Sequence, residues 1–298
     1  MSAVARNALT VDVEDYFQVT AFERVIDPAT WDRYPLRVGD NSLRVLDLFD
    51  RYGVKGTFFV LGWVARRDPD LVRRIRQRGH EIACHGFGHQ LVYRIGPEAF
   101  RLDIRNAKAL LEDITGEAVC GYRAPSYSIT ARSLWALDIL MEEGFSYDSS
   151  IFPIMHDIYG IPDAPRFPYV ISRPSGTIRE FPISTVQVRG FFRDLRLPVG
   201  GGGYLRLLPA VWFRQAFLRM NRGGHPGVLY FHPWEIDPDQ PRIKAGFRSR
   251  FRHYLNLDRM EGRIASLLSV LPFAPMGQVL AEIPDLPLVG KGVGGACR

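Results

Sequence analysis

A repeating local pattern is the feature that most limits what this chain can fold into. Up to about residue 150, apolar residues recur at helical spacing, a glycine ends each helix-like segment, and a β-prone run with polar residues follows. The pattern predicts strands at 9–19, 54–64, 80–86, 118–129 and 145–153 and helices at 41–53, 68–79, 96–116 and 130–144. Strands that alternate with helices are typical of parallel βαβ units, so we expect an α/β fold.

The alternation is less regular after residue 153. The prolines and glycines of 153–176 predict a long surface loop. Later segments predict a strand at 177–188, a glycine run that closes on an apolar stretch at 197–209, a strand at 225–236 and a final helix at 250–271. No linker separates the two halves, so we expect the second half to complete the first domain.

Composition excludes several classes of protein. With 46% apolar and 23% charged residues over 298 positions, the chain is typical of a soluble globular protein. The N-terminus lacks the apolar core of a secretory signal, and no run of about 18 apolar residues occurs. An odd number of cysteines does not suggest a disulfide framework. We therefore expect a cytoplasmic protein without a transmembrane segment.

The charge suggests anionic partners. The net charge is +6, and a basic stretch at 242–252 could meet an anionic glycan or a lipid phosphate, or could simply be a solvated helix face. No sequence pattern of a nucleic-acid-binding module occurs, so we expect no nucleic-acid partner.

Polar clusters follow the predicted strands. In parallel α/β barrels the active site is built at the carboxyl ends of the strands. Five clusters meet this description: Asp12 with Glu14 and Asp15, His85 with His89, Arg123 to Tyr127, Asp148, and His232.

The pair His85 and His89 has the spacing of a metal site. Two imidazoles four residues apart can bind one ion, and the glycines at 86 and 88 favour a tight turn over a regular helix. Two neutral histidines and one carboxylate would leave open positions on a divalent ion, which is typical of a catalytic metal. The alternative is a pair of surface histidines.

Two further residues have open interpretations. Arg123 comes shortly before a proline, which favours an extended backbone in the residue that precedes it. The arginine could pair with a carboxylate of the site, although a surface salt bridge is the simpler interpretation. His232 follows four apolar residues and is either a structural histidine or, beside an acid, a tuned acid or base.

Taken together, the order and type of these clusters resemble the polysaccharide deacetylase superfamily, the NodB-homology or carbohydrate esterase 4 enzymes. The resemblance spans about residues 8 to 270, and "VDVEDYF" and "FHPWEID" look more specifically like the deacetylases of exosortase (PEP-CTERM) loci. It implies a distorted (β/α) barrel, a catalytic domain at 8–240 with an insertion at about 155–225, and a helical extension at 241–298 packed on the same domain.

The resemblance also implies roles for individual residues. Asp12 would be the general base, His85 and His89 metal ligands, and His232 the acid that protonates the departing amine. Arg123 would orient Asp12, and Asp148 would lie beside the groove or support the acid. Tyr127, in the third motif, would contribute to oxyanion stabilisation, and Tyr127 and Trp234 would bind substrate.

The acidic metal ligand stays open between two neighbours. The family's first motif commonly has two adjacent aspartates, whereas Asp12 is followed here by Val13, Glu14 and Asp15. Side chains alternate along a strand, which favours Glu14, but Asp15 could turn in if the strand ended at Val13. The expected cofactor is a divalent metal, zinc first, with cobalt, nickel or manganese as alternatives.

The implied reaction is hydrolysis of acetamido groups on N-acetylated sugars of an exopolysaccharide or its lipid-linked precursor. The expected partner is therefore an N-acetylated glycan or glycolipid, with peripheral association to an anionic lipid-linked substrate. Two alternatives are a cyclic-amide or ureide hydrolase on the same scaffold and a non-catalytic glycan-binding relative.

Overall fold

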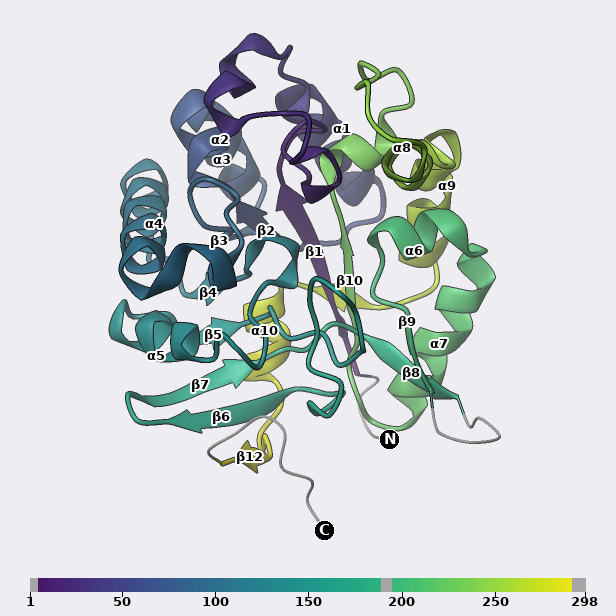
Figure 1. Cartoon of the computed structure of the whole chain (residues 1–298). Helices are drawn as coiled ribbons and strands as arrows, with labels where there is room; N and C mark the ends of the chain where they lie inside the picture. The colour runs from purple at the N-terminus through teal and green to yellow at the C-terminus, as the bar shows by residue number, and fades with distance from the viewer. Residues whose placement is uncertain (1–4, 189–194, 291–298) are drawn as a thin grey trace.

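Strand β1 (Asn7–Val13) is buried along its whole length and holds the sheet together. It pairs in parallel with β10 (Val228–Phe231) on one side and with β2 (Thr57–Val60) on the other. The computed structural model describes residues 5–188 and 195–290, and Figure 1 shows β1 and β10 side by side at the centre of the molecule. Two strands that are far apart in the sequence are therefore neighbours in the sheet.

The main sheet has the order β10-β1-β2-β3-β4-β5-β7-β6-β12, and β11 pairs with β1 outside this path. All its pairs are parallel except β6 with β7. Within residues 5–188 and 195–290, no pairing joins β10 to β12, so the hydrogen-bonded ladder is open. The remaining strands of this sheet are β3 (Glu81–Cys84), β4 (Gly121–Tyr122), β5 (Tyr147–Asp148), β6 (Tyr169–Arg173), β7 (Gly176–Glu180), β11 (Phe273–Ala274) and β12 (Leu288–Val289).

A separate two-stranded sheet and the helices surround this main sheet. Strands β8 (Thr185–Val188) and β9 (Leu195–Pro198) form an antiparallel pair. Figure 1 shows α2 to α5 on one side of β1 and β10 and α6 to α9 on the other. The α-helices are α1 (Val38–Arg51), α2 (Gly62–Arg67), α3 (Pro69–Gln77), α4 (Val92–Thr115), α5 (Trp135–Glu142), α6 (Gly202–Leu207), α7 (Ala210–Arg222), α8 (Phe247–Tyr254), α9 (Leu257–Leu268) and α10 (Met276–Ala281). The 3-10 helices are η1 (Thr20–Phe22), η2 (Pro28–Arg33), η3 (Pro125–Tyr127) and η4 (Pro233–Ile236).

Local sequence signals explain the helices of the first half. Helix α3 begins where the Asp68 side chain accepts a hydrogen bond from the Leu71 amide, with Pro69 at the first helical position. Helix α4 ends at Gly116, whose φ of 70° lies in the left-handed region that stops helices. The apolar faces of these helices pack on the buried strands and form the main core.

The expected alternation of strands and helices is confirmed, but several boundaries were wrong. Segment 54–64 is a strand only over β2, because α2 follows at once. The predicted loop 153–176 contains strand β6, and the predicted strand 177–188 is interrupted between β7 and β8. The glycine-rich stretch after 197 continues into α6 and α7, which the pattern did not predict.

The final helix is also divided. Helices α8 and α9 replace the single helix predicted at 250–271, with the break at Asn256, whose φ is 51°. The elements after residue 240 contact the first half of the chain through β11 and α10, which lie against β1. The division at 240 and the bounds of the insertion stay predictions. Among the residues that the structure describes, no helix is long and apolar enough to cross a membrane.

Candidate active site

A cavity of about 210 Å³ lies at the carboxyl ends of neighbouring strands. Strand β1 supplies Asp12, Glu14 follows directly after it, and the segments after β3, β4 and β10 supply the other predicted site residues of the cavity. The register pairs Val11 with Phe231, so Asp12 and His232, which follow them, lie at the same level of the sheet. The predicted site residues that line the cavity are Asp12, Glu14, His85, His89, Tyr127, His232 and Trp234.

One carboxylate and two imidazoles form a group suited to a metal ion. The ligand atoms of Glu14, His85 and His89 all lie within 4.8 Å of one another. His85 Nδ1 is 2.8 Å from the carbonyl oxygen of Arg123, which can only accept, so Nδ1 donates and Nε2 keeps its lone pair. Burial lowers the pKa of His85 to about 4, so its ring is neutral near pH 7, as a metal ligand must be.

Glu14 and His89 face each other inside this group. Glu14 Oε2 lies 2.6 Å from His89 Nε2. Despite this short distance, Glu14 Oε2 is buried and accepts no hydrogen bond from any of the residues that the structure describes. Burial raises the pKa of Glu14, but the positive charges of His89 and His232 outweigh it and hold the pKa at about 2. An ionised, buried carboxylate oxygen aimed at imidazoles fits a divalent cation.

Asp15 has a different environment. Its carboxylate accepts hydrogen bonds from the backbone amides of Tyr16 at 2.9 Å, Arg37 at 2.7 Å and Val38 at 2.9 Å. Strand β1 ends at Val13, as the argument for Asp15 required, but the side chain turns toward the start of α1. The structure therefore brings Glu14, and not Asp15, to the two histidines.

Asp12 is paired with a buried arginine. Arg123 is fully buried, and its Nη1 donates to Asp12 Oδ1 at 2.6 Å and to Thr10 Oγ1 at 2.8 Å. Its Nε and Nη2 donate to Ser149, and its guanidinium lies 4.1 Å from the centre of the Phe59 ring. Burial alone would lower the pKa of Arg123, but the Asp12 charge raises it, so Arg123 stays charged. Arg123 thus fixes the carboxylate of Asp12 in position.

His232 lies across the cavity from Asp12 and Glu14. Its Nε2 is 4.0 Å from Asp12 Oδ2 and 3.6 Å from Glu14 Oε1, while Nδ1 is 3.1 Å from Glu235 Oε2. Burial lowers the pKa of His232, but the charges of Glu14, Glu235 and Asp12 raise it to about 9. The ring is therefore protonated at neutral pH, with Nε2 facing the cavity.

Two residues that hold His232 were missed from the sequence. Glu235 is buried and also accepts a hydrogen bond from the His232 amide, and Arg206 donates to its other oxygen at 2.6 Å. Glu235 forms a capping box with His232, a pattern of a glutamate three residues after the cap that could have identified it. Arg206 comes from α6, and no local signal links it to the site.

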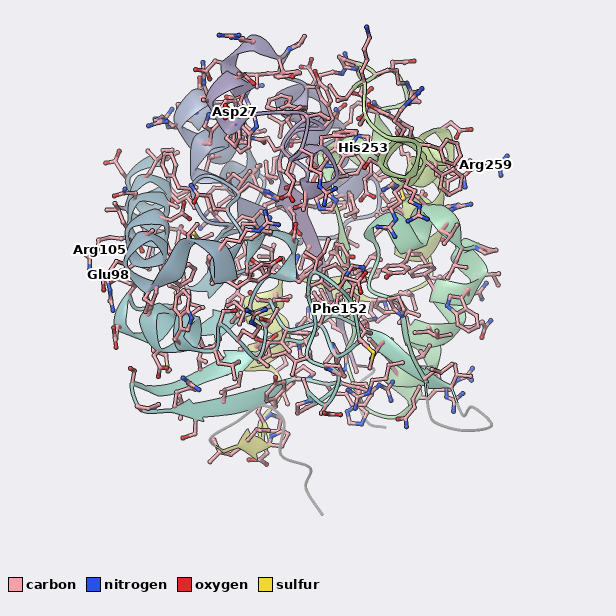
Figure 2. The ribbon with its side chains drawn as sticks, viewed as in Figure 1. Asp27, Glu98, Arg105, Phe152, His253 and Arg259 are labelled. Carbon is pink, nitrogen blue, oxygen red and sulfur yellow. The ribbon has the colours of Figure 1, made fainter. Side chains whose placement is uncertain are left out.

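The predicted substrate-binding residues both border the cavity. Trp234 stacks between His232 and His253, with ring centres 5.2 Å and 4.1 Å away, and its Nε1 donates to Glu14 at 3.4 Å. His253 and Phe152, both labelled in Figure 2, are buried. Tyr127 has a φ of 53°, and its amide already donates to the Ala124 carbonyl, so its hydroxyl and ring are what it offers the cavity.

Asp148 lies outside the residues that line the cavity. It is fully buried on β5, in register with Glu180 on β7, and its carboxylate accepts a hydrogen bond from Ser150 Oγ at 2.6 Å. Ser149 and Ser150 in turn bond Arg123 and Ala124. The structure therefore places Asp148 behind Arg123, from where it can act on the site only through this turn.

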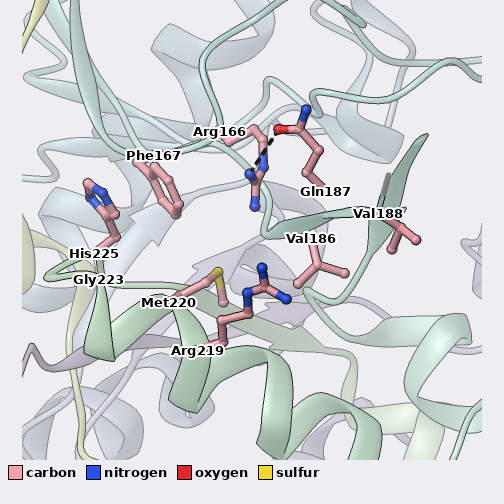
Figure 3. Close-up of a pocket in the computed structure, with 9 residues that line it drawn as sticks. All are labelled: Arg166, Phe167, Val186, Gln187, Val188, Arg219, Met220, Gly223 and His225. Atoms are coloured by element: carbon pink, nitrogen blue, oxygen red, sulfur yellow. Dashed lines mark hydrogen bonds between the residues drawn. The ribbon is translucent and has the colours of Figure 1, made fainter. Parts of the chain in front are cut away.

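A larger cavity of about 680 Å³ lies elsewhere, between α7, β8 and the segment around Arg166 (Figure 3). Arg166, Phe167, Arg219 and His225 line it, and none of the predicted site residues does. The grouping of the predicted residues, and not cavity size, therefore identifies the candidate active site.

Two family models match separate parts of the chain. Residues 28–140 match the model described as polysaccharide deacetylase, and residues 149–281 match one described as a domain of unknown function, DUF3473. The chain carries a polysaccharide deacetylase domain. The expected family is thereby confirmed, whereas the assignment to the exosortase type stays a prediction.

The curated relatives match only part of this chain. A peptidoglycan-N-acetylglucosamine deacetylase of Bacillus cereus is 28% identical over 118 residues, which are 36% of this chain and 43% of that protein. A peptidoglycan deacetylase of Helicobacter pylori is 29% identical over 108 residues, which are 36% of each protein. The match thus spans less than half the length of these relatives.

A solved structure extends the likeness to the whole fold. A protein from Mycobacterium smegmatis that was assigned as a polysaccharide deacetylase superposes with a TM-score of 0.61 at 21% identity. The superposition covers 98% of this chain and 96% of that protein, so the fold is shared although the sequences have diverged.

The candidate site draws on both matched parts of the chain. His85, His89, Arg123 and Tyr127 lie within residues 28–140, and His232 and Trp234 within residues 149–281. Asp12 and Glu14 precede both matches. The cavity is therefore incomplete without the second matched part.

Proposed function

We propose that this protein is a metal-dependent hydrolase that removes acetyl groups from N-acetylated sugars and releases acetate. The observation that carries the proposal is that Asp12, the group of Glu14, His85 and His89, and the protonated ring of His232 all line one cavity. His232 Nε2 lies 4.0 Å from Asp12 Oδ2 and 3.6 Å from Glu14 Oε1. The family match and the names of the relatives support the same reaction.

The donor set supports metal binding. Glu14, His85 and His89 would hold the ion, since one buried anionic oxygen and two imidazoles suit zinc and similar divalent ions. When bound, such an ion polarises the acetamido carbonyl and makes water more acidic. We propose zinc, with cobalt, nickel and manganese as alternatives.

Asp12 is suited to the role of general base. Its pairing with Arg123 holds one oxygen, and the other faces the cavity toward His232. A water placed against the acetamido carbonyl carbon would pass a proton to this carboxylate as its oxygen attacks. Because Arg123 is fixed by Thr10 and Ser149 as well, the carboxylate keeps its orientation during the reaction.

His232 is suited to the role of general acid. The carbon–nitrogen bond breaks with its electron pair going to the sugar nitrogen, and that nitrogen needs a proton to leave as an amine. His232 Nε2 faces the cavity, and Glu235 holds the proton on the opposite nitrogen. Trp234 packs against the ring and limits its rotation.

The finer assignments are also proposals. The relatives are named as deacetylases of peptidoglycan and chitooligosaccharide, which supports an N-acetylglucosamine-containing substrate. We place the reaction on an exopolysaccharide or its lipid-linked precursor in the cytoplasm, where the basic residues Arg242, Lys244, Arg248, Arg250 and Arg252 could approach an anionic carrier.

The test is acetate release from a panel of acetylated glycans, with and without a chelator. Release that stops on chelation and returns with added zinc is the expected result. Hydrolysis of allantoin without release from any glycan would instead favour the ureide hydrolase, and glycan binding without release in any metal would favour a non-catalytic protein.

A further inference from the structure

The cavity of about 680 Å³ beside α7 shares no lining residue with the catalytic cavity. Figure 3 shows Arg166 and Arg219 extending toward one another from its opposite walls, the segment before β6 and helix α7. Its volume lies within the range of ligand pockets, about 300–1,000 Å³. We call it the arginine cavity.

Hydrogen bonds to neutral groups hold the arginines around this cavity. Arg166 donates from Nε to Thr185 Oγ1 at 3.2 Å and from Nη2 to the Thr185 carbonyl oxygen at 2.7 Å. Arg196 of β9 donates to the Ala164 carbonyl oxygen at 2.7 Å. Within residues 5–188 and 195–290, no carboxylate forms an ion pair with Arg166, Arg196 or Arg219. These contacts fix two of the guanidinium groups but neutralise none of the charges.

The arginines repel one another. Burial, and then the charges of Arg196 and Arg219, lower the pKa of Arg166. An arginine side chain nevertheless keeps its proton in proteins, so the arginine cavity holds like charges whose repulsion an anion would relieve.

The positions of two of these groups favour one kind of anion. A carboxylate has two oxygens and is satisfied by a single guanidinium fork, whereas a phosphate group has more oxygens and can bridge two forks. Arg166 and Arg219 come from opposite walls, so they match the phosphate group better than the carboxylate.

The rest of the cavity wall is aromatic and aliphatic. The Phe167 ring stacks on His225 with ring centres 3.8 Å apart, and the Arg166 guanidinium lies 5.1 Å from the centre of the Phe167 ring. Val186 and Met220 also line the cavity. A molecule that carries both a phosphate group and an apolar or aromatic group would therefore contact both parts of the wall.

One face of the β8–β9 hairpin extends the apolar part of the wall. Val186 pairs with Leu197 and Val188 with Leu195 in this antiparallel sheet, so the four side chains share a face. Val188, Leu195 and Leu197 are 39%, 47% and 37% exposed. Apolar side chains that remain exposed beside a cavity are typical of a binding surface.

We propose that the arginine cavity is a binding site for a phosphate group, held between Arg166 and Arg219. The group could be free phosphate, the headgroup of a lipid whose chain lies along the hairpin face, or part of a nucleotide whose base stacks beside Phe167 and His225. The cavity lies within residues 149–281, so the proposal gives that matched part a binding role of its own. It does not depend on the deacetylase reaction.

Calorimetric titration of the full chain tests the proposal. The probes are inorganic phosphate, farnesyl phosphate and uridine monophosphate, with glucuronate as the carboxylate for comparison. We expect the phosphate probes to bind and glucuronate to bind about tenfold more weakly or not at all. Arg219→Gln should weaken phosphate binding by about 10- to 100-fold, which is the effect of losing one charged hydrogen-bonding group.

Arg214→Gln is the matched control. It removes the same charge from an exposed position of α7 that does not line the arginine cavity, so this variant should bind phosphate as the wild type does. The Arg219 side chain makes no hydrogen bond or ion pair within the described residues, so its replacement should leave the fold intact. Thermal unfolding of both variants checks this.

The probes also distinguish the three sources of the phosphate group. Farnesyl phosphate that binds more tightly than inorganic phosphate, with the gain lost in Val188→Asn, would support the proposal and assign a lipid. Uridine monophosphate that binds more tightly, with the gain lost in His225→Ala, would support it and assign a nucleotide. Equal binding of all three probes that is weakened in Arg219→Gln would support a site for phosphate alone.

Three results would overturn the proposal. The first is the absence of binding by every phosphate probe, and the second is binding of glucuronate as tight as that of phosphate. The third is phosphate binding that is unchanged in Arg219→Gln, or that Arg214→Gln weakens as much, because the bound phosphate would then lie elsewhere or respond only to net charge.

Discussion

His232 Nε2 lies 4.0 Å from Asp12 Oδ2, although the two residues are far apart in the sequence. Each follows a residue of the parallel pair Val11 and Phe231, so the sheet register sets the distance between them. Because the Nδ1 side of His232 is held by Glu235 and one oxygen of Asp12 by Arg123, the two remaining atoms face each other. Arg123 thus positions Asp12, the proposed base, and Glu235 positions His232, the proposed acid.

Replacing a ligand should remove the metal. We expect His85→Ala and Glu14→Gln to lower bound zinc to background and to abolish acetate release, since a third donor is needed to hold the ion. Elemental analysis of the purified variants is the measurement. Asp15→Asn is the matched control and should retain metal, because Asp15 bonds backbone amides. Full hydrolysis by metal-free protein would contradict the proposed reaction.

Asp15→Ala should instead weaken the fold. Three amides lose their acceptor, and a buried donor left unpaired costs about 1–3 kcal/mol, so we expect the free energy of unfolding to fall by roughly 2–4 kcal/mol. Urea denaturation of the metal-free protein measures this. A variant of unchanged stability that loses metal would show that Asp15 is the acidic ligand.

His232→Ala should affect substrates according to their leaving groups. Hydrolysis of the acetamido sugar should fall by about 10²–10⁴-fold, because the amine leaves without a proton donor. An activated ester such as 4-nitrophenyl acetate needs no such proton, so its hydrolysis should fall far less. Asp12→Asn provides the comparison and should slow both substrates alike. Equal losses for His232→Ala on both substrates would argue against the acid role.

Breaking the buried ion pair should cost both stability and activity. Arg123→Gln leaves the Asp12 carboxylate buried without its partner, and we expect a loss of about 3–5 kcal/mol in the free energy of unfolding. Adding Asp12→Asn in the same protein should recover part of that loss, since no buried charge remains. Thermal or urea unfolding of the single and double variants gives the comparison. Additive losses would show that the pair is not coupled.

The buried carboxyl groups of Asp148 and Glu180 should make the free energy of unfolding depend on pH. Burial, and then the charge of Asp148, raise the pKa of Glu180 well above 4.5, and burial raises the pKa of Asp148 to about 6. The native state therefore holds a proton that the unfolded chain releases above about pH 4.5. As the pH rises from there through the raised pKa of Glu180, the free energy of unfolding should fall, by at most about 1.4 kcal/mol per pH unit for one proton.

Glu180→Gln isolates that contribution. The variant keeps the shape of the side chain but cannot ionise, so the difference in unfolding free energy between variant and wild type should grow with pH. Urea titrations of both proteins from acid to mildly alkaline pH, after chelation, measure the difference. Parallel curves would show that Glu180 releases its proton equally in both states.

Much of the fold was predictable because the signals were local. Helical spacing, caps and terminal glycines identified α1, α3, α4 and α5, and the polar clusters were correctly expected at or just after the ends of strands. The pattern failed where elements were short or neighbours overrode it. Strand β6 lies in a proline-rich segment predicted as loop, and the glycines before α6 gave no helical signal.

The sequence by itself determined which residues stand at strand ends and that two histidines follow β3 at metal-binding spacing, because periodicity and spacing are properties of neighbouring residues. Only the tertiary structure decided between Glu14 and Asp15, since that choice depends on which distant amides compete for each carboxylate. It likewise placed Asp148 behind Arg123 and brought Arg206 of α6 to Glu235. These contacts join segments far apart in the chain, and no local pattern encodes how such segments pack.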